Sequence, residues 1–210
     1  MSQTDPRQDI VTAARALCAL DLNRGAAGNL SVRSGDGFLI TPTGLASDAM
    51  QPDDIVLMTM DGHWRGARKP SSEWRFHRDI YAARPEAGAI VHAHAPFATA
   101  LACLRVDIPP FHYMIARFGG HSVRCAAYAT FGTQALSDAA LTALDGRCAC
   151  LLANHGMLAF GRDLRHAVDL AVELESLCEQ YWRAAQIGPP VLLADAEMDI
   201  VLEKFGSYGQ

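Results

Sequence analysis

One short apolar run in this chain carries two histidines. The run is Ala89-Ile90-Val91-His92-Ala93-His94-Ala95, and its Ala, Ile and Val residues predict a buried strand. Because side chains alternate between the two faces of a strand, His92 and His94 should point the same way. Two imidazoles on one face can hold a metal ion, since neutral imidazole is a common zinc ligand. A catalytic zinc takes about three protein ligands and keeps one position open, so further ligands should exist elsewhere in the chain.

The size and composition of the chain are those of one globular domain. It has 210 residues, of which 50% are hydrophobic and 20% are charged, an ordinary balance for a globular protein. We therefore expect residues 1–210 to form a single domain. No apolar stretch approaches the length that spans a bilayer, and residues 1–9 lack the charged-then-apolar pattern of a secretion signal.

The net charge and the cysteines indicate which binding partners and which cellular compartment to expect. The net charge is −5 and the Lys and Arg residues are scattered, which argues against a nucleic acid or an anionic membrane as the main partner. The cysteines lie mostly in apolar surroundings, which favours small core residues in a reducing cytoplasm over a disulfide framework. They are Cys18, Cys103, Cys125, Cys148, Cys150 and Cys178. Cys148 and Cys150 could form a metal pair, but their apolar neighbours favour a buried strand.

The order of helical and strand patterns predicts an α/β fold. Apolar spacing and end signals predict helices at about 9–22, 71–83, 96–104, 133–144, 164–185 and 197–205. Strand patterns cover 30–33, 38–41, 55–60, 89–95, 123–126, 149–153 and 157–160, with tight turns at 34–37, 61–62 and 154–156. This order fits a central, mainly antiparallel sheet flanked by helices on both faces better than regular βαβ repeats.

Two further residues could complete a metal site with the strand histidines. His155 leaves a buried strand at a turn that contains Gly156, which suits a ligand aimed into a cleft, although such a histidine taken alone is more often structural. Glu73 is expected in the first turn of a helix, where the helix dipole favours a carboxylate. That dipole effect is itself an alternative explanation for Glu73. A capping box is not, because Glu73 follows Ser71 and Ser72 directly.

Small and hydroxyl-bearing residues form three candidate anion turns. Ser71 and Ser72 stand at an expected helix start, where backbone amides and hydroxyls suit a phosphate. The other two turns are Gly28-Asn29 and Thr43-Gly44. Each alone could be plain turn chemistry, and none has the P-loop pattern, so a nucleotide is not implied. A phosphate pocket and a metal pocket would adjoin at Ser72-Glu73.

Five motifs, in their order along the chain, resemble the class II aldolase/adducin family. They are Gly28-Asn29-Leu30-Ser31, Thr41-Pro42-Thr43-Gly44, Pro70-Ser71-Ser72-Glu73, His92-Ala93-His94 and Asn154-His155-Gly156. Each motif is weak alone, but the ordered set is specific and the resemblance covers almost the entire chain. It is closest to the L-fuculose-phosphate aldolase branch of the family.

The resemblance implies a role for each matching position. The zinc ligands are matched by His92, His94 and His155, and Glu73 matches a carboxylate that is a metal ligand at rest and an acid/base in turnover. The phosphate-binding turns are matched by Gly28, Asn29, Thr43, Gly44, Ser71 and Ser72. The residues that shape the aldehyde end are matched by Tyr113, Phe131, Phe205 and Tyr208. Manganese or cobalt could replace zinc at such a ligand set.

The activity implied by the resemblance is that of a metal-dependent lyase. It would cleave a deoxy-ketose 1-phosphate, such as L-fuculose 1-phosphate or 5-deoxy- or 5-methylthio-ribulose 1-phosphate, reversibly to dihydroxyacetone phosphate and an aldehyde through a zinc-stabilised enediolate. The resemblance also implies a homotetramer in which Tyr113 reaches the site of a neighbouring subunit.

Two alternatives to the aldolase remain open on the same scaffold. One is a sugar-phosphate 4-epimerase or dehydratase, but epimerases of this family carry Asp at the position of Glu73. The other is a non-catalytic, adducin-like interaction module, which would be expected to lack the metal ligands. Glu73 and the three histidines therefore favour the aldolase.

Overall fold

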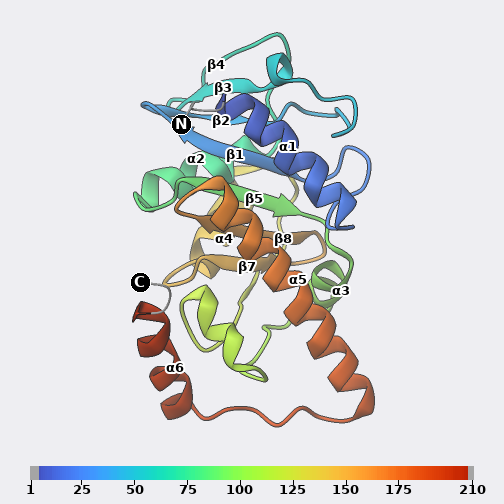
Figure 1. The fold of residues 1–210 in the computed structure, drawn as a ribbon, viewed down its shortest axis with the longest axis vertical. Coiled ribbons are helices and arrows are strands. Elements are labelled where there is room, and N and C mark those ends of the chain that lie inside the picture. Colours follow the sequence, from blue (N-terminus) through green and yellow to red (C-terminus); the bar gives the residue numbers. More distant parts are fainter. Residues whose placement is uncertain (1–4, 208–210) are drawn as a thin grey trace.

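The computed structural model describes residues 5–207, which contain one eight-stranded β-sheet (Figure 1). The strands follow the order β4-β3-β2-β1-β5-β8-β7-β6. Every neighbouring pair is antiparallel except β6 and β7, which are parallel. The strands are β1 (Asn29–Ser34), β2 (Gly37–Ile40), β3 (Val56–Thr59), β4 (Trp64–Arg65), β5 (Ala89–Ala93), β6 (Cys125–Ala126), β7 (Ala149–Leu152) and β8 (Gly156–Gly161).

Helices cover both faces of this sheet. The α-helices are α1 (Pro6–Ala19), α2 (Trp74–Ala83), α3 (Pro96–Leu104), α4 (Gln134–Ala143), α5 (Leu164–Ile187) and α6 (Asp195–Ser207), and the 3-10 helices are η1 (Pro52–Asp54) and η2 (Tyr113–Phe118). Buried side chains of α1, α3 and α5 form one hydrophobic core with the sheet, and those of α2 and α4 form a second. Figure 1 shows α1 and α5 crossing the same face. The expected fold, a mainly antiparallel sheet between helical layers, is confirmed.

The strand that carries the histidines lies at the centre of the sheet. β5 pairs with β1 on one side and with β8 on the other. Its side chains alternate as expected: Val91 and Ala93 enter the core under α1, α3 and α5, whereas Ile90 enters the core under α2 and α4. His92 shares the face of Ile90, and its ring contacts Phe76 of α2. His94 lies one residue beyond the end of the strand, where the backbone leaves the sheet.

The helix expected at 71–83 begins later, at Trp74. The N–H of Ser71 donates to the carbonyl of Thr41 (3.0 Å), and Pro70 forms a β-bridge with Pro42. These contacts keep the segment extended beside the end of β2. The placement of Glu73 inside the first helical turn was therefore wrong, because Glu73 occupies the N-cap position instead.

Two other sequence-based expectations also need correction. The first helix begins at Pro6 rather than at residue 9, because Asp5 caps it by accepting a hydrogen bond from the N–H of Arg7 (3.0 Å). Cys103 is exposed rather than part of the core, since α3 buries its opposite face. All six cysteines are free, and Cys148 is only half-buried.

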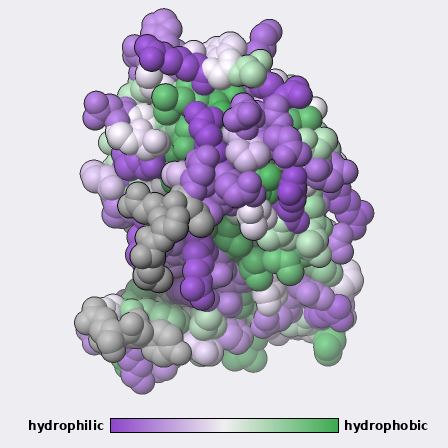
Figure 2. All heavy atoms as spheres, turned by 45° about the horizontal axis from the view of Figure 1, so that its top comes forward, coloured by the Kyte–Doolittle hydropathy of each residue, from purple (hydrophilic) through white to green (hydrophobic). Residues whose placement is uncertain are grey.

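The surface of the described chain is mixed in character. Figure 2 shows hydrophilic side chains over most of the viewed face, with hydrophobic areas between them. None of the described helices combines the length and the apolar content needed to cross a membrane.

Candidate active site

Three histidines that are distant in sequence meet at the end of β5. His92 lies on β5, His94 follows it, and His155 lies in the turn between β7 and β8, where β8 is the neighbour of β5. The ring centroids are 4.8–4.9 Å apart and the rings are inclined by 72–78° to one another. One nitrogen of each ring lies within 4.8 Å of a nitrogen of the other two. The structure therefore brings together the three histidines that the sequence nominated.

A tight turn orients His155 toward the other two rings. Asn154 has a φ of 54°, a left-handed conformation that asparagine tolerates better than most residues. The Asn154 side-chain oxygen accepts a hydrogen bond from Arg105 Nε (2.6 Å). Gly156 cannot carry a side chain here, because a Cβ atom would lie 2.4 Å from the carbonyl oxygen of Ala93. The backbone is thus fixed on both sides of His155.

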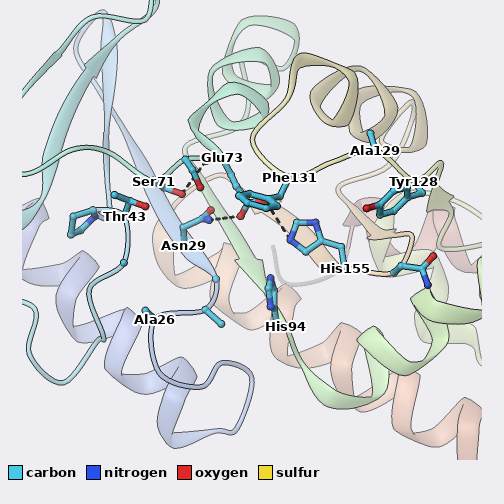
Figure 3. A pocket seen from close by; sticks show the side chains of 16 residues that line it. Ala26, Asn29, Thr43, Ser71, Glu73, His94, Tyr128, Ala129, Phe131 and His155 are labelled. Carbon is cyan, nitrogen blue, oxygen red and sulfur yellow. Dashed lines mark hydrogen bonds and ion pairs between the residues drawn. The ribbon is translucent and has the colours of Figure 1, made fainter.

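Glu73 supplies a carboxylate to the same cluster (Figure 3). Its Oε2 atom lies 3.2 Å from His92 Nε2, and its Oε1 atom lies 3.3 Å from His155 Nε2. Oε2 also accepts a hydrogen bond from Asn29 Nδ2 (2.9 Å). The side chain makes no capping hydrogen bond to α2. Helix-dipole complementarity alone does not account for this orientation, because the carboxylate turns toward the histidines.

Burial and charge set the protonation states of these groups. Burial, together with the positive charge that a protonated His92 would carry, lowers the pKa of His94 and that of His155 to about 4. Burial alone would raise the pKa of Glu73, but the contact with His92, the charges that protonated His92 and His155 would carry, and the hydrogen bond from Asn29 lower it to about 2. At neutral pH His94 and His155 are therefore unprotonated imidazoles beside the Glu73 carboxylate.

This set of donor atoms fits a divalent metal ion. His92 donates from Nδ1 to the carbonyl of Met157 (2.9 Å), which leaves the lone pair of its Nε2 atom facing His94 Nε2 at 3.1 Å. The Oε1 atom of Glu73 is buried and has no hydrogen-bond partner among the described residues. Acceptor atoms this close repel one another unless a cation lies between them. Zinc accepts histidine nitrogens and carboxylate oxygens, and manganese or cobalt can use the same set.

A pocket of about 310 Å³ opens beside these groups (Figure 3). Its volume lies at the lower end of the range for small-molecule sites, roughly 300–1,000 Å³. Ten residues nominated from the sequence line it: Gly28, Asn29, Thr43, Gly44, Ser71, Ser72, Glu73, His94, Phe131 and His155. His92 does not line the pocket, because it is fully buried in the sheet behind these residues.

The three predicted anion turns form the polar wall of this pocket. Thr43 is tied to the segment before α2 by a hydrogen bond from its N–H to the carbonyl of Lys69 (3.1 Å). Gly28 has a φ of 74°, and a Cβ atom there would lie 2.4 Å from the Asn23 side chain, so only glycine fits. Backbone hydrogen bonds therefore hold the Thr43 turn against the segment before α2, and close packing on Asn23 fixes the turn at Gly28.

The polar wall offers hydrogen-bond donors but no positive side chain. Within residues 5–207, the backbone N–H groups of Gly44 and Ser72 have no hydrogen-bond acceptor, and neither lysine nor arginine lines the pocket. An anion bound here would meet backbone N–H groups and hydroxyls, as anions do at helix starts and backbone nests.

Two of the residues nominated for the aldehyde end lie away from this pocket. Tyr113 begins η2, and it stacks on Phe205 of α6 with the ring centroids 6.5 Å apart. Neither residue lines the pocket of its own chain, and Tyr113 is half exposed. Tyr208 lies outside the described residues. One chain therefore does not bring all the nominated residues together.

Other lining residues were not nominated from the sequence. Tyr128 and Ala129 precede Phe131 on one loop, and the ring of Tyr128 lies 5.5 Å from the guanidinium of Arg105. Phe131 is 65% exposed at the pocket rather than packed in the core. The closeness of Tyr128 to Phe131 in sequence was the signal that could have found it. The remaining lining residues are Ala26, Ala27, Pro42 and Asn154.

A histidine near the site predicts an acid-sensitive fold. His77 is fully buried, and burial, followed by the charge of a protonated His92, lowers its pKa from 6.5 to about 3. Below pH 6.5, His77 therefore binds a proton in the unfolded chain but not in the folded chain. This difference at His77 lowers the free energy of unfolding by about 1.4 kcal/mol per pH unit down to pH 3. Urea unfolding in chelator at several pH values should show a slope to which His94 and His155 also contribute, and His77→Phe should make it shallower by that amount. Equal slopes in both proteins would contradict the assignment.

Comparison with known proteins gives the family of the chain. The sequence profile described as Class II Aldolase and Adducin N-terminal domain matches residues 8–182. The chain belongs to this family. The resemblance inferred from the five motifs is thereby confirmed.

Similar proteins in this family are named as aldolases. A 5-methylthioribulose-1-phosphate/5-deoxyribulose-1-phosphate aldolase from Rhodospirillum rubrum is 60% identical over 203 residues, which are 97% of this chain and 92% of that protein. An L-fuculose phosphate aldolase from Escherichia coli (strain K12) is 44% identical over 210 residues, which are 100% of this chain and 98% of that protein. A solved structure of L-fuculose 1-phosphate aldolase has a TM-score of 0.93 and 42% identity, with 98% of each chain covered. These similarities support class II aldolase function.

Proposed function

We propose that this class II aldolase family member cleaves a deoxy-ketose 1-phosphate reversibly to dihydroxyacetone phosphate and an aldehyde. The observation that carries the proposal is the junction at Ser72 and Glu73, where the histidine cluster adjoins the polar wall of the pocket. A substrate held by its phosphate in that wall would have its carbonyl end beside Glu73 and the histidines. Relatives at 60% and 44% identity are named as aldolases of such sugar phosphates, which supports the same reaction class.

Four side chains would hold the metal ion, for which zinc is our first candidate. They are His92, His94, His155 and, in the resting enzyme, Glu73. When bound, the metal would act as a Lewis acid that withdraws negative charge from the substrate oxygens next to the bond that breaks. The hydrogen bond from His92 to the carbonyl of Met157 fixes that ring with its free nitrogen toward the site, which is the usual support of a ligating histidine.

The residues of the chain itself would bind the substrate and move its protons. The N–H groups of Gly44 and Ser72, with the neighbouring hydroxyls of Thr43 and Ser71, would bind the phosphate. Binding energy from that remote group would hold the reacting carbons in place. Glu73, as a carboxylate beside the reacting carbons, would exchange a proton at C3 of the dihydroxyacetone-phosphate half.

The far end of the pocket would receive the aldehyde half. Phe131 and Tyr128 present aromatic surface there, which suits a short apolar substituent better than a hydroxylated one. The relative at 60% identity is named for 5-methylthio- and 5-deoxyribulose 1-phosphate. We therefore propose these two ketose phosphates, ahead of L-fuculose 1-phosphate, as substrates.

A homotetramer in the cytoplasm would complete the enzyme. Tyr113 and Phe205 stack on each other outside the pocket of their own chain, so they could act only in the site of a neighbouring subunit. Tyr113 would there exchange a proton with the C4 hydroxyl that becomes the aldehyde. Light scattering coupled to size-exclusion chromatography would test the fourfold assembly.

A product assay tests the proposed reaction. Zinc-loaded protein would be offered 5-methylthioribulose, 5-deoxyribulose and L-fuculose 1-phosphates, and dihydroxyacetone phosphate would be measured with and without chelator. We expect release that chelator stops and that added zinc restores. Release that chelator does not affect, or no release from any of the three, would refute the proposal.

Mixing two inactive variants tests the shared site. Tyr113→Phe and Glu73→Gln should each lose about a hundredfold or more in turnover, because each lacks one proton-transfer group. Coexpressed tetramers should regain activity in about a quarter of their sites, since some sites then combine an intact Glu73 with a neighbour's intact Tyr113. The measurement is specific activity of the copurified mixture. If mixing restores nothing while both variants assemble normally, Tyr113 does not act across subunits.

A further inference from the structure

A chain of buried polar side chains connects Glu73 with the interior of the fold. Asn29 Nδ2 donates to Glu73 Oε2 (2.9 Å), and Asn29 Oδ1 lies 2.5 Å from His77 Nε2. The other ring nitrogen of His77 lies 2.7 Å from Ser31 Oγ, which lies 2.8 Å from the hydroxyl of Tyr81. All five residues are buried, and His77 and Ser31 have no exposed surface.

This chain of contacts follows from the spacing of its members on two elements. Glu73, His77 and Tyr81 are four residues apart at the start of and along α2, so they share one face of that helix. Asn29 and Ser31 are two residues apart on β1, so they share one face of that strand. The helix face packs on the strand face, and the polar side chains of the two elements alternate.

The ionised carboxylate of Glu73 sets the direction of each hydrogen bond in this chain of buried side chains. An ionised carboxylate only accepts, so the amide of Asn29 must turn its NH₂ group to Glu73 and its oxygen to His77. His77 must then carry its proton on Nε2 and accept from the hydroxyl of Ser31 at Nδ1. Ser31 in turn accepts from Tyr81. All four donors point toward Glu73.

The surroundings of His77 keep the imidazole neutral and its ring fixed. The ring lies beside Phe76, with centroids 4.7 Å apart, and is stacked at 6.5 Å on Phe38. Burial lowers its pKa to about 3. A neutral imidazole has one donor and one acceptor, so it links Ser31 to Asn29 in a single direction.

We propose that His77 is a positioning residue of the aldol site, which holds the Asn29 amide with its NH₂ group toward Glu73 and the pocket. This inference rests on the proposed function, since it concerns the geometry of the same site. The reversed amide would set Asn29 Oδ1 against Glu73 Oε2 at hydrogen-bond distance, and two acceptors there repel. The amide has a second N–H, and because Asn29 lines the pocket, the same orientation offers it to a substrate oxygen.

Two substitutions at one position separate positioning from packing. His77→Phe fills the space between the rings of Phe38 and Phe76 but gives Asn29 no donor, whereas His77→Gln keeps an N–H at the place of Nε2. We expect kcat to fall about 10–100-fold in His77→Phe, as for other supporting partners of a metal site, with a smaller change in KM. His77→Gln should restore most of the lost kcat. Thermal melting and metal content of each variant are measured alongside.

A double-mutant cycle then asks whether His77 acts through Asn29. In an Asn29→Ala background, His77→Phe should lower kcat no further, because the group that it positions is gone. A merely structural histidine would cost the same in both backgrounds. Equal loss in both backgrounds, or wild-type kcat in His77→Phe, would overturn the inference.

The tautomer of His77 can be observed directly in the wild-type protein. Ring-labelled ¹⁵N-histidine spectra of the metal-free wild-type protein should show His77 with a proton on Nε2 and a bare Nδ1, and through-space contacts with the rings of Phe38 and Phe76 assign the signal. A proton on Nδ1 would overturn the inference even if the variant does not fold. Absence of dihydroxyacetone phosphate release by the wild type would instead overturn the proposed function, because the tautomer reports the amide orientation independently.

Discussion

Replacing Glu73 with glutamine should lower turnover about a hundredfold to ten-thousandfold, the usual contribution of a general acid/base. Glutamine has nearly the same shape and can keep the contact with Asn29, but it cannot take a proton from the substrate. The three histidines remain, so the metal should stay bound. The measurement is kcat for dihydroxyacetone phosphate release, together with metal content after desalting.

A matched control for this variant lies on the same helix. Asp79 of α2 is a largely buried carboxylate bound to Arg78 and Ser137 on the side of α4, and it does not line the pocket. Asp79→Asn also removes one negative charge, so it should cost stability but leave kcat nearly unchanged. Near-wild-type kcat in a metal-loaded Glu73→Gln protein would end the assignment of Glu73 as the acid/base.

Removing His155 should abolish both metal retention and activity. His155→Ala removes one of the three imidazole ligands, so the metal would be held only by two histidines and the Glu73 carboxylate, which must also serve as the acid/base. A Lewis acid contributes several kcal/mol to the barrier reduction, which corresponds to a loss of about a thousandfold in rate. Metal content by mass spectrometry and rate in the product assay should therefore fall together.

An exposed histidine provides the comparison for that experiment. His63 lies in the turn between β3 and β4, away from the cluster, so His63→Ala should keep the full metal content and the full rate. If His155→Ala keeps stoichiometric metal, or if His63→Ala loses as much, the three-histidine site is refuted.

Local patterns in the sequence were enough to predict most of the elements around the site. The β5 strand and the hairpin at Asn154 have strong signals, namely an apolar run and a turn residue that tolerates a positive φ. The helix at 96–104 was predicted with both of its ends, because Pro96 is favoured in the first turn of a helix. These signals act over a few residues, so they can be seen in the sequence.

Expectations failed where distant contacts changed a local preference. The segment at Ser71 has the composition of a helix start, but its hydrogen bond to Thr41 holds it extended and delays α2. Cys103 has apolar neighbours, yet it lies on the outer face of α3. Apart from its closeness to Phe131 in sequence, Tyr128 carries no signal of a site, because the path of its loop brings it to the pocket.

The sequence by itself determined which chemistry the chain can support. The identity of His92, His94, His155 and Glu73, and the alternation that turns both strand histidines the same way, are local properties that require no knowledge of packing. The tertiary structure alone decided that β8 lies beside β5, which brings His155 to the other rings. It also decided that α2 packs on β1, which joins His77 to Asn29 and so to Glu73. Such contacts between distant segments depend on which hydrophobic faces pack together, and no short stretch of sequence specifies that.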